Sequence, residues 1–347
     1  MELAIIEQKS HLLTPSRLPC LGSLPTLHLA SGCMHGCLDC CAQGSCGPIG
    51  SGKMGGLQKV AIADNCLTKL REELSRRHPR PPAVCFDFSS DPFQPVPELL
   101  DRTYEVLEYL LGEGIGVVFQ TKAKIPERHI DLLLAHATSH PHAGTRQAVD
   151  GMPFVRAIIP LVTIDRRLLR IFEPRTATPR TRLSQMRTLV AGGVATLARV
   201  DPILPGLTDD PDALHGLCAA LAEAGVREMA AGTLVLRPAL IEVLRNRLAR
   251  PQIFRRLTQA FAPGSGQRFT HHAPPRCSGK ANPGFRVLSA ARRRRIFEWL
   301  TAIAGQYGIR VHVCACKNPD LAGQSCKLAG PWSPAEVFER QLALFSE

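Results

Sequence analysis

The regular alternation of short apolar runs with helical patterns limits the folds open to this 347-residue chain more than any other feature. Six runs have the near-continuous apolar character of strands that are buried on both faces of a parallel sheet. They are residues 24–31, 83–89, 116–121, 155–163, 195–203 and 231–237. Strand–helix units in series predict a parallel α/β fold, as either an open six-stranded barrel or a doubly wound sheet.

The segments between these runs have the period of amphipathic helices, and Gly and Pro lie at the joins. The predicted helices cover residues 62–77, 98–113, 126–136, 166–172, 180–192, 211–224 and 239–249. A Pro- and Gly-rich stretch at 262–285 indicates a boundary, followed by a helix at 288–306, a short strand at 309–314 and a final helix that begins near Ser333. We therefore predict a barrel over residues 1–250 and a small C-terminal, Cys-containing cap over 251–347.

Charge and hydropathy indicate which partners and which location the protein has. The chain has 42 Lys and Arg against 30 Asp and Glu, a net charge of +12, which favours a polyanionic partner such as nucleic acid. Free use of Arg by a GC-rich genome would explain the same balance. No uncharged apolar run reaches about 18 residues, and the start MELAIIEQKSHLLT lacks the apolar stretch of a secretory signal. We expect a cytoplasmic protein with no membrane segment.

Cysteine is the most informative residue type, with 13 in the chain. In a reducing compartment, clustered cysteines indicate metal binding or catalysis more often than disulfides. One cluster lies within residues 33–46, and Cys277 joins a second one near the C-terminus. Cys85 and Cys218 lie in apolar stretches and are expected to be inert core thiols.

The first cluster contains Cys33, Cys37 and Cys40 in the spacing C-x3-C-x2-C, directly after the first predicted strand. In a parallel barrel the chemistry takes place on loops at the C-terminal ends of the strands. Three thiolates on one short loop suit an iron–sulfur cluster and would leave one of four irons open. The alternative is a zinc knuckle that adds Cys41, Cys46 or His35 as the fourth ligand.

This spacing resembles the signature of the radical S-adenosylmethionine (SAM) superfamily. The resemblance implies a [4Fe-4S] cluster whose open iron binds the amino and carboxylate groups of SAM. It also implies a 5′-deoxyadenosyl radical that takes hydrogen from a substrate, and an electron donor such as flavodoxin or ferredoxin. The residue before the third cysteine is commonly aromatic in this superfamily and packs near the adenine, whereas this chain has Asp39.

Four further segments resemble enzymes similar to spore photoproduct lyase. They are FDFSSDPFQPVP at 86–97, QTK at 120–122, the segment VTIDRRLLRIFEPRTATPRTRLSQMRTLVAGG at 162–193, and ARVDPILPGLTDD at 198–210. The likeness covers about residues 10–240. It implies the partial (β/α)6, TIM-like barrel of the radical SAM type.

The same resemblance suggests residues that bind SAM. Ser89, Ser90 and Asp91 would accept hydrogen bonds from its ammonium group, and Lys122 would meet its carboxylate. Asp91 could instead be a helix cap, and Lys122 an ordinary surface lysine.

Two more residues are included among the SAM contacts. Thr163 ends the fourth strand, although related enzymes carry a serine three residues earlier, where this chain has Pro160. Arg199 lies inside the fifth strand, where a buried arginine needs a partner. The SAM carboxylate is the first candidate for that partner, and Glu173 is the second.

The second cysteine cluster consists of Cys277, Cys314, Cys316 and Cys326. Four thiolates could close a second [4Fe-4S] cluster or a zinc site, or could remain free thiols. A catalytic reading is also open, because spore photoproduct lyase uses a cysteine thiol as a hydrogen donor. Cys41 and Cys316 are the candidates for that role here.

Three functions follow from these observations. The first is a radical SAM enzyme, lyase-like or oxidoreductase-like, that acts on a nucleic-acid base. The second is a radical SAM enzyme with an auxiliary cluster that modifies a peptide or small metabolite by oxidation, thioether formation or sulfur insertion. The third is a zinc-stabilised nucleic-acid-binding protein.

Overall fold

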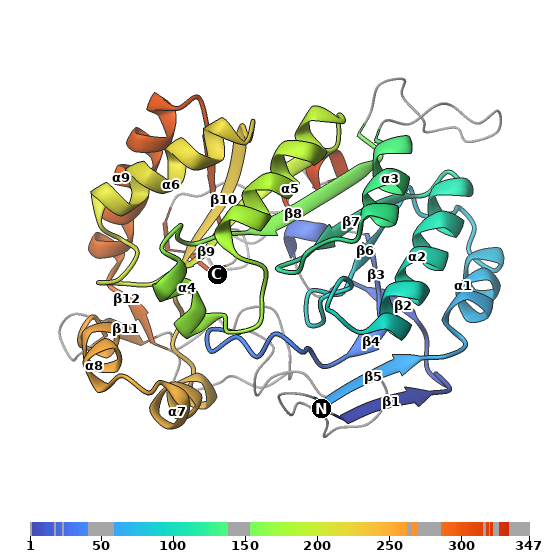
Figure 1. Ribbon diagram of the computed structural model, residues 1–347, viewed down its shortest axis with the longest axis horizontal. Coiled ribbons are helices and arrows are strands. Elements are labelled where there is room, and N and C mark those ends of the chain that lie inside the picture. Colours follow the sequence, from blue (N-terminus) through green and yellow to red (C-terminus); the bar gives the residue numbers. More distant parts are fainter. Residues whose placement is uncertain are drawn as a thin grey trace, which may run out of the picture.

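An eight-stranded sheet forms the centre of the computed structural model (Figure 1). The structure describes residues 2–16, 19–22, 24–40, 59–137, 153–261, 266–268, 286–314, 317–318, 320–321 and 326–332. The strand order is β13-β10-β9-β8-β7-β6-β3-β2. The bounds are β2 (Leu13–Pro15), β3 (Pro25–Leu27), β6 (Ala83–Phe86), β7 (Gly116–Gln120), β8 (Val155–Pro160), β9 (Ala195–Ile203), β10 (Glu228–Thr233) and β13 (Arg310–Val313).

The six strands expected from the apolar runs are β3, β6, β7, β8, β9 and β10, and they lie side by side in chain order. All of their pairings are parallel, and β2 alone joins this sheet antiparallel. The C-terminal ends of the parallel strands therefore meet along one edge. The outer strands β13 and β2 are not paired with each other in the described part, so the sheet is open there.

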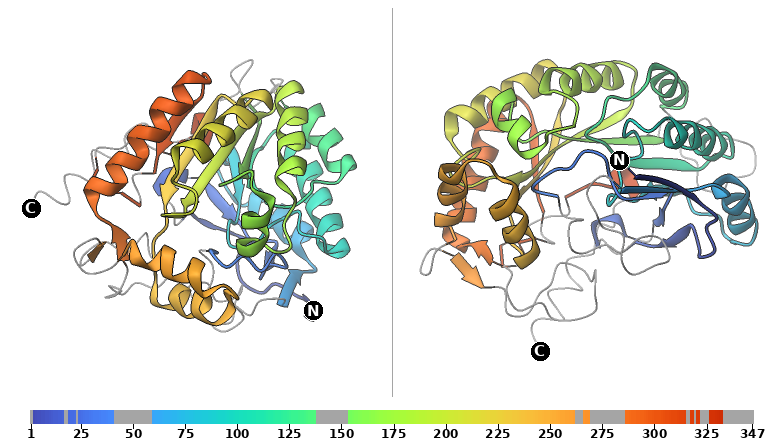
Figure 2. Two further views of the ribbon diagram at one scale, coloured as in Figure 1. Left: turned by 60° about the vertical axis from the view of Figure 1, so that its left-hand side comes forward. Right: turned by 60° about the horizontal axis from the view of Figure 1, so that its bottom comes forward.

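Helices cover one face of this sheet. The right-hand view of Figure 2 shows α6, α5, α3 and α2 side by side above the strands. The helix bounds are α1 (Cys66–Ser75), α2 (Pro97–Gly112), α3 (Glu127–Ala135), α4 (Arg166–Phe172), α5 (Pro179–Ala191), α6 (Pro211–Glu223), α7 (Pro238–Arg247), α8 (Pro251–Gln259) and α9 (Ala290–Gln306). Several begin with the sequence signals expected of helix starts. The side chains of Asp165, Thr178, Asp210 and Ser289 each accept a hydrogen bond from the first turn.

Each face of the sheet has its own core. Two large apolar clusters fill the space between the strands and the helices. A third, smaller cluster contains Val118, Ile158 and Leu197, and the short segments 19–21 (η1, Pro19–Leu21) and 326–329 pack against it. Because strand side chains alternate between faces, this third cluster marks the inner face of the curved sheet.

The predicted strand at 24–31 is divided between two sheets, which corrects that prediction. Its first part is β3, whereas β4 (Ala30–Ser31) pairs with β5 (Lys59–Ala63) in a small sheet of order β1-β5-β4, where β1 is Glu2–Ile6. The sequence did not predict this small sheet. Its pairing turns the chain out of the main sheet just before the first cysteine cluster.

The C-terminal part contributes to the main sheet. The expected helix and short strand are α9 and β13, and β13 pairs in parallel with β10. The structure adds α8 and a two-stranded ribbon of β11 (Gly266–Arg268) and β12 (Arg286–Leu288), which the sequence did not predict. The division at residue 250 stays a prediction, and the helix near Ser333 lies outside the described residues. In the described part, no helix is long and apolar enough to cross a membrane.

Candidate active site

The loop Gly32–Cys40 follows β4 and carries the first three clustered cysteines (Figure 1). Gly32 and Gly36 have φ values of 84° and 65°, a backbone region that favours glycine. A Cβ on Gly32 would lie 1.9 Å from the Lys59 carbonyl oxygen, so no other residue fits there. The Leu38 amide donates to the Phe172 carbonyl at 2.7 Å, which holds the far end of the loop against α4.

The segment after β6 fixes the near end of this loop. Ser90 Oγ donates to the Gly32 carbonyl at 2.7 Å, and the Gln94 side chain does so at 3.3 Å. Gln94 Oε1 also accepts from the Met34 amide at 2.7 Å. The side chains of Ser90 and Gln94 therefore hold the backbone on both sides of Cys33.

Asp91 is the centre of a buried hydrogen-bond network beneath the loop. Its Oδ2 lies 2.9 Å from His35 Nε2 and accepts from the Lys122 amide at 2.7 Å. Its Oδ1 accepts from Thr121 Oγ1 at 2.7 Å and from the Phe93 amide at 2.9 Å. Burial alone would raise the pKa of Asp91, but His35 and these hydrogen bonds lower it. The carboxylate thus joins the cysteine loop to the ends of β6 and β7.

A cation lies beside the loop thiols. Lys122 Nζ is 4.0 Å from Cys37 Sγ and donates to Glu173 Oε1 at 2.7 Å. Arg182, which is fully buried, pairs with the other oxygen of Glu173. Burial would raise the pKa of Glu173, but Arg182 and Lys122 lower it to about 2. Glu173 is therefore a buried anion between two cations, and it holds Lys122 near Cys37.

Asp39 has an unsatisfied oxygen in this site. Its side chain is 3 % exposed, and Oδ2 lies 3.8 Å from Lys122 Nζ. Oδ1 is buried and has no hydrogen-bond partner in the described part of the chain. Burial raises the pKa of Asp39, although Lys122 opposes this. A buried polar atom without a partner needs an explanation, and a bound ligand that donates a hydrogen bond supplies one.

The three cysteine thiols of the loop differ in burial. Cys37 is buried, and Cys33 and Cys40 are half-buried. Burial raises the pKa of Cys33 to about 11, with Asp91 adding to the rise. Among the described residues, no group of three or more His, Cys, Asp or Glu side chains is arranged to hold one metal ion. Three thiols on one short loop suit a [4Fe-4S] cluster, which takes each thiolate on a different iron.

A second charged group lies further along β9. Arg199 donates to Asp201 Oδ2 through Nη2 at 2.9 Å and Nε at 3.2 Å, and to Gln120 Oε1 through Nη1 at 2.5 Å. Lys317 Nζ lies 2.5 Å from Asp201 Oδ1. Burial would raise the pKa of Asp201, but Lys317 and Arg199 lower it to about 2. The expectation that Glu173 could pair with Arg199 is wrong, since Glu173 is held by other cations.

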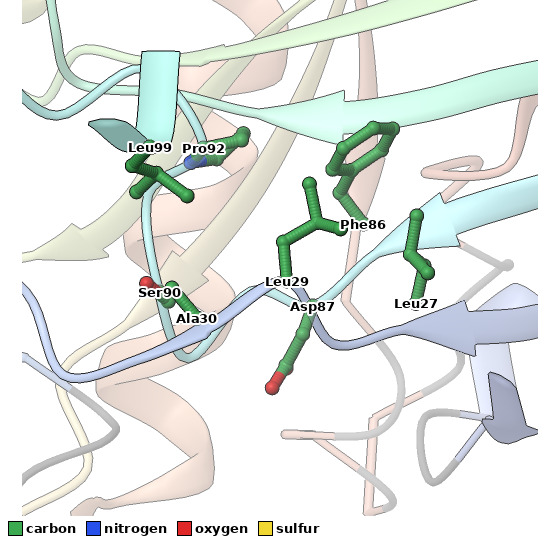
Figure 3. A pocket seen from close by; sticks show the side chains of 8 residues that line it. All are labelled: Leu27, Leu29, Ala30, Phe86, Asp87, Ser90, Pro92 and Leu99. Atoms are coloured by element: carbon green, nitrogen blue, oxygen red, sulfur yellow. The ribbon is translucent and has the colours of Figure 1, made fainter. Parts of the chain in front are cut away.

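The remaining predicted SAM contacts, Ser89 and Thr163, make local hydrogen bonds. Ser89 Oγ donates to Asp87, whose Oδ2 lies 2.8 Å from His28 Nδ1. Thr163 Oγ1 accepts from the Asp165 amide at 3.1 Å. Figure 3 shows that the Asp87 carboxylate points away from Leu27 and other apolar side chains of a small cavity between β3, β6 and α2. That cavity measures about 10 Å³, room for roughly one water molecule.

The second cysteine cluster has a member that sequence reasoning missed. Cys326 hydrogen-bonds with both Cys314 and Cys20, and these contacts raise the pKa of its thiol well above the ordinary value. All three thiols are buried in the inner-face core. Cys20 is almost 300 residues from Cys314, so no local spacing could identify it. Cys41, Cys277 and Cys316 lie outside the described residues, and their roles stay predictions.

Comparisons with known proteins agree with this architecture. No protein-family model matches the chain. The uncharacterized protein Rv2578c of Mycobacterium tuberculosis is 26% identical over 214 residues, 60% of this chain and 59% of that protein. Uncharacterized protein Mb2609c of Mycobacterium bovis matches with the same identity and coverage. The matched region is therefore less than two thirds of these relatives' length.

Solved structures show the fold. A spore photoproduct lyase double mutant with bound AdoMet and dinucleoside spore photoproduct aligns with a TM-score of 0.62 at 15% identity, over 89% of this chain and 81% of that one. The radical SAM methyltransferase TsrM from Kitasatospora setae, with tryptophan and a SAM analogue bound, aligns with a TM-score of 0.51 at 11% identity, over 92% and 62%. The chain has the α/β fold of these radical SAM enzymes, which confirms the fold expected from the sequence.

Proposed function

We propose that this protein is a radical SAM enzyme. One observation carries the proposal: a loop with three cysteines lies at the C-terminal edge of a sheet that has the radical SAM fold, and Lys122 Nζ lies 4.0 Å from Cys37 Sγ. Cys33, Cys37 and Cys40 would hold a [4Fe-4S] cluster. When bound, the cluster and SAM would supply a 5′-deoxyadenosyl radical for the abstraction of hydrogen from a substrate.

The chain's own residues would bind and orient SAM. Lys122, held by Glu173 beside Cys37, would meet the SAM carboxylate. Asp39 Oδ1, which lacks a donor among the described residues, would accept a hydrogen bond from SAM. This carboxylate stands where related enzymes commonly have an aromatic side chain, so a polar contact would replace packing.

Asp91 has a positioning role in this proposal. Its two oxygens already accept or share four hydrogen bonds, which leaves little capacity for the SAM ammonium. We assign recognition of the ammonium to Ser89 and Ser90 instead. Thr163 and Arg199 remain proposed contacts of the cofactor.

For the substrate, we propose a nucleic-acid base. The net charge of +12 supports a polyanionic partner, and the lyase that shares this fold has been solved with a dinucleoside photoproduct. A flavodoxin or ferredoxin would supply the electron. Binding to DNA should weaken as salt rises, and binding without salt dependence would contradict this substrate.

A peptide or metabolite substrate is the second candidate, favoured by the group of Cys20, Cys314 and Cys326. If these thiols belong to a second cluster, the variant Cys314→Ala with Cys326→Ala should lose about half of the bound iron. Unchanged iron would remove the basis for this candidate.

SAM cleavage by protein purified without oxygen tests the proposed activity. With dithionite and SAM, the protein should form 5′-deoxyadenosine, and Cys37→Ala should form none. Lys69→Met is the matched control, because this side chain lies on α1 and, among the described residues, its Nζ bonds only the Lys9 carbonyl, at 3.1 Å. Absence of 5′-deoxyadenosine from the cluster-loaded protein would contradict the proposal.

A further inference from the structure

Two arginine-rich segments lie next to the cysteine loop at the C-terminal edge of the sheet. One is α4 with the residues that follow it as far as position 175, and the other is α7 and α8 with the turn between them. Seven of their arginines are exposed and make no side-chain hydrogen bond or ion pair within the described part of the chain. We call this set the arginine rim; it consists of Arg166, Arg167, Arg175, Arg247, Arg250, Arg255 and Arg256.

Packing and hydrogen bonds hold both segments against the cysteine loop. His35 Nδ1, in the loop, lies 3.1 Å from the carbonyl oxygen of Arg175. Leu38, also in the loop, belongs to the same apolar cluster as Leu240 of α7 and Leu257 of α8. Figures 1 and 2 show α4, α7 and α8 on one side of the molecule. The arginine rim therefore lies beside the proposed iron–sulfur site.

Positive charge is not spread evenly over the helices. α2, on the opposite side of the molecule in Figure 1, has four acidic side chains and one arginine. α4 has three arginines and no acidic residue, and α8 has two arginines and no acidic residue. The single acid of α7, Glu242, pairs with Arg245 and not with a member of the rim. General use of arginine would place it on all helices alike, so this distribution indicates a surface that meets an anion.

An extended polyanion fits this surface better than a compact ligand. The arginines come from two separate segments and are exposed, so a chain of phosphates can meet several of them at once. Guanidinium groups bond phosphate oxygens through two parallel N–H donors, which favours arginine for this role. The described residues of both segments present no exposed aromatic side chain on which a base could stack. The contacts are therefore to the backbone, and they do not depend on base sequence.

We propose that the arginine rim binds the sugar–phosphate backbone of a nucleic acid and holds it beside the cysteine loop. This inference rests on the proposed function for its catalytic meaning. It goes beyond that function by assigning the docking surface, which consists of residues that neither the cluster nor SAM uses.

Fluorescence anisotropy with a labelled DNA duplex of mixed sequence tests the rim, on cluster-loaded protein with SAM present. The triple variant Arg167→Gln, Arg247→Gln, Arg255→Gln removes charge from both segments. Its affinity for DNA should fall at least about tenfold at about 150 mM salt. The slope of log affinity against log salt should become smaller by about 2 to 3, since each phosphate contact contributes roughly 0.9.

The matched control is the triple variant Arg76→Gln, Arg187→Gln, Arg310→Gln. These arginines are also exposed, and they lie outside the rim, after α1, on α5 and at the first position of β13. The control removes the same net charge, so its DNA affinity should stay within about threefold of the original. Equal losses in the two triple variants would overturn the proposal, because net charge alone would then explain binding. Original affinity and slope in the rim variant would overturn it as well.

Formation of 5′-deoxyadenosine by the same preparations separates this proposal from the proposed function. With dithionite as reductant, the rim variant should cleave SAM as fast as the original protein. If the original protein cleaves no SAM, the proposed function fails, and the DNA comparison still decides whether the rim binds a nucleic acid. Unchanged DNA binding, with slower cleavage from reduced flavodoxin but not from dithionite, would overturn the proposal and assign the rim to an acidic electron donor.

Discussion

Replacing Glu173 by glutamine should destabilise the protein strongly, because it leaves two buried cations without their anion. Glu173 is 1 % exposed and pairs with Lys122 and Arg182, the latter fully buried. The pKa of Glu173 falls from 4.5 to about 2 on folding. At 1.36 kcal/mol per pKa unit, this shift corresponds to about 3 kcal/mol. The loss of one partner from a buried pair costs roughly 3–5 kcal/mol, which agrees.

The assay is urea denaturation of Glu173→Gln and the original protein, purified without oxygen, at pH 7.5. The expected loss in the free energy of unfolding is about 3 kcal/mol. Because the folded pKa is lowered, the contribution is complete above pH 4.5 and disappears as the pH falls towards about 2. The difference between the two proteins should therefore narrow over that range.

Glu242→Gln is the matched control. Glu242 Oε1 lies 2.8 Å from Arg245 Nη1, but both side chains are more than half exposed. Its loss should change stability by less than about 0.5 kcal/mol. A loss under about 1 kcal/mol for Glu173→Gln at pH 7.5 would show that the pairing of Glu173 with Lys122 and Arg182 contributes little to stability.

Three further outcomes are expected. Gly32→Ala should lower the iron bound per chain, because its Cβ would lie 1.9 Å from the Lys59 carbonyl oxygen. Gly305→Ala in α9, where the new Cβ meets open space, should not lower it. Equal iron content in the two variants would contradict the geometry of the cysteine loop. The free energy of unfolding of Asp201→Asn should fall less steeply with acid than that of the original protein. The lowered pKa of Asp201 contributes stability above pH 3.8 that is lost as the pH falls to about 2. Parallel curves of stability against pH for the two proteins would contradict this. Arg293→Met should lower the free energy of unfolding, measured by urea denaturation, by about 3 kcal/mol or more. Arg293 is fully buried and donates to Asp320 and Asn318. A loss below about 1 kcal/mol would show that these hydrogen bonds contribute little to stability.

The main sheet was predictable because its strands are buried on both faces and read as continuous apolar runs. The same rule failed at β1 and β5, which are short strands of a small outer sheet. It also failed at residues 24–31, where the apolar run continues although the chain changes sheets after Leu27. Apolar composition indicates only that residues are buried, and they stay buried where the chain passes from one sheet to the other.

The candidate site was also only partly predictable from the sequence. The spacing of Cys33, Cys37 and Cys40 predicted that one loop carries all three, and it does. The ion-pair partners of Glu173 and Asp201 were not predicted. Lys122 and Arg182, which pair with Glu173, come from other elements, and Lys317 is 116 residues from Asp201. Spacing shows local chemistry, while ion pairs across a sheet depend on the tertiary fold. Cys20 was missed for the same reason.

The most direct test of the central claim is the iron and acid-labile sulfide content of protein purified without oxygen. We expect about four of each per chain, from one [4Fe-4S] cluster. Both should be lost when Cys33, Cys37 and Cys40 are replaced by alanine. Zinc without sulfide, retained by that triple variant, would rule out the iron–sulfur cluster and favour a zinc-stabilised binding protein.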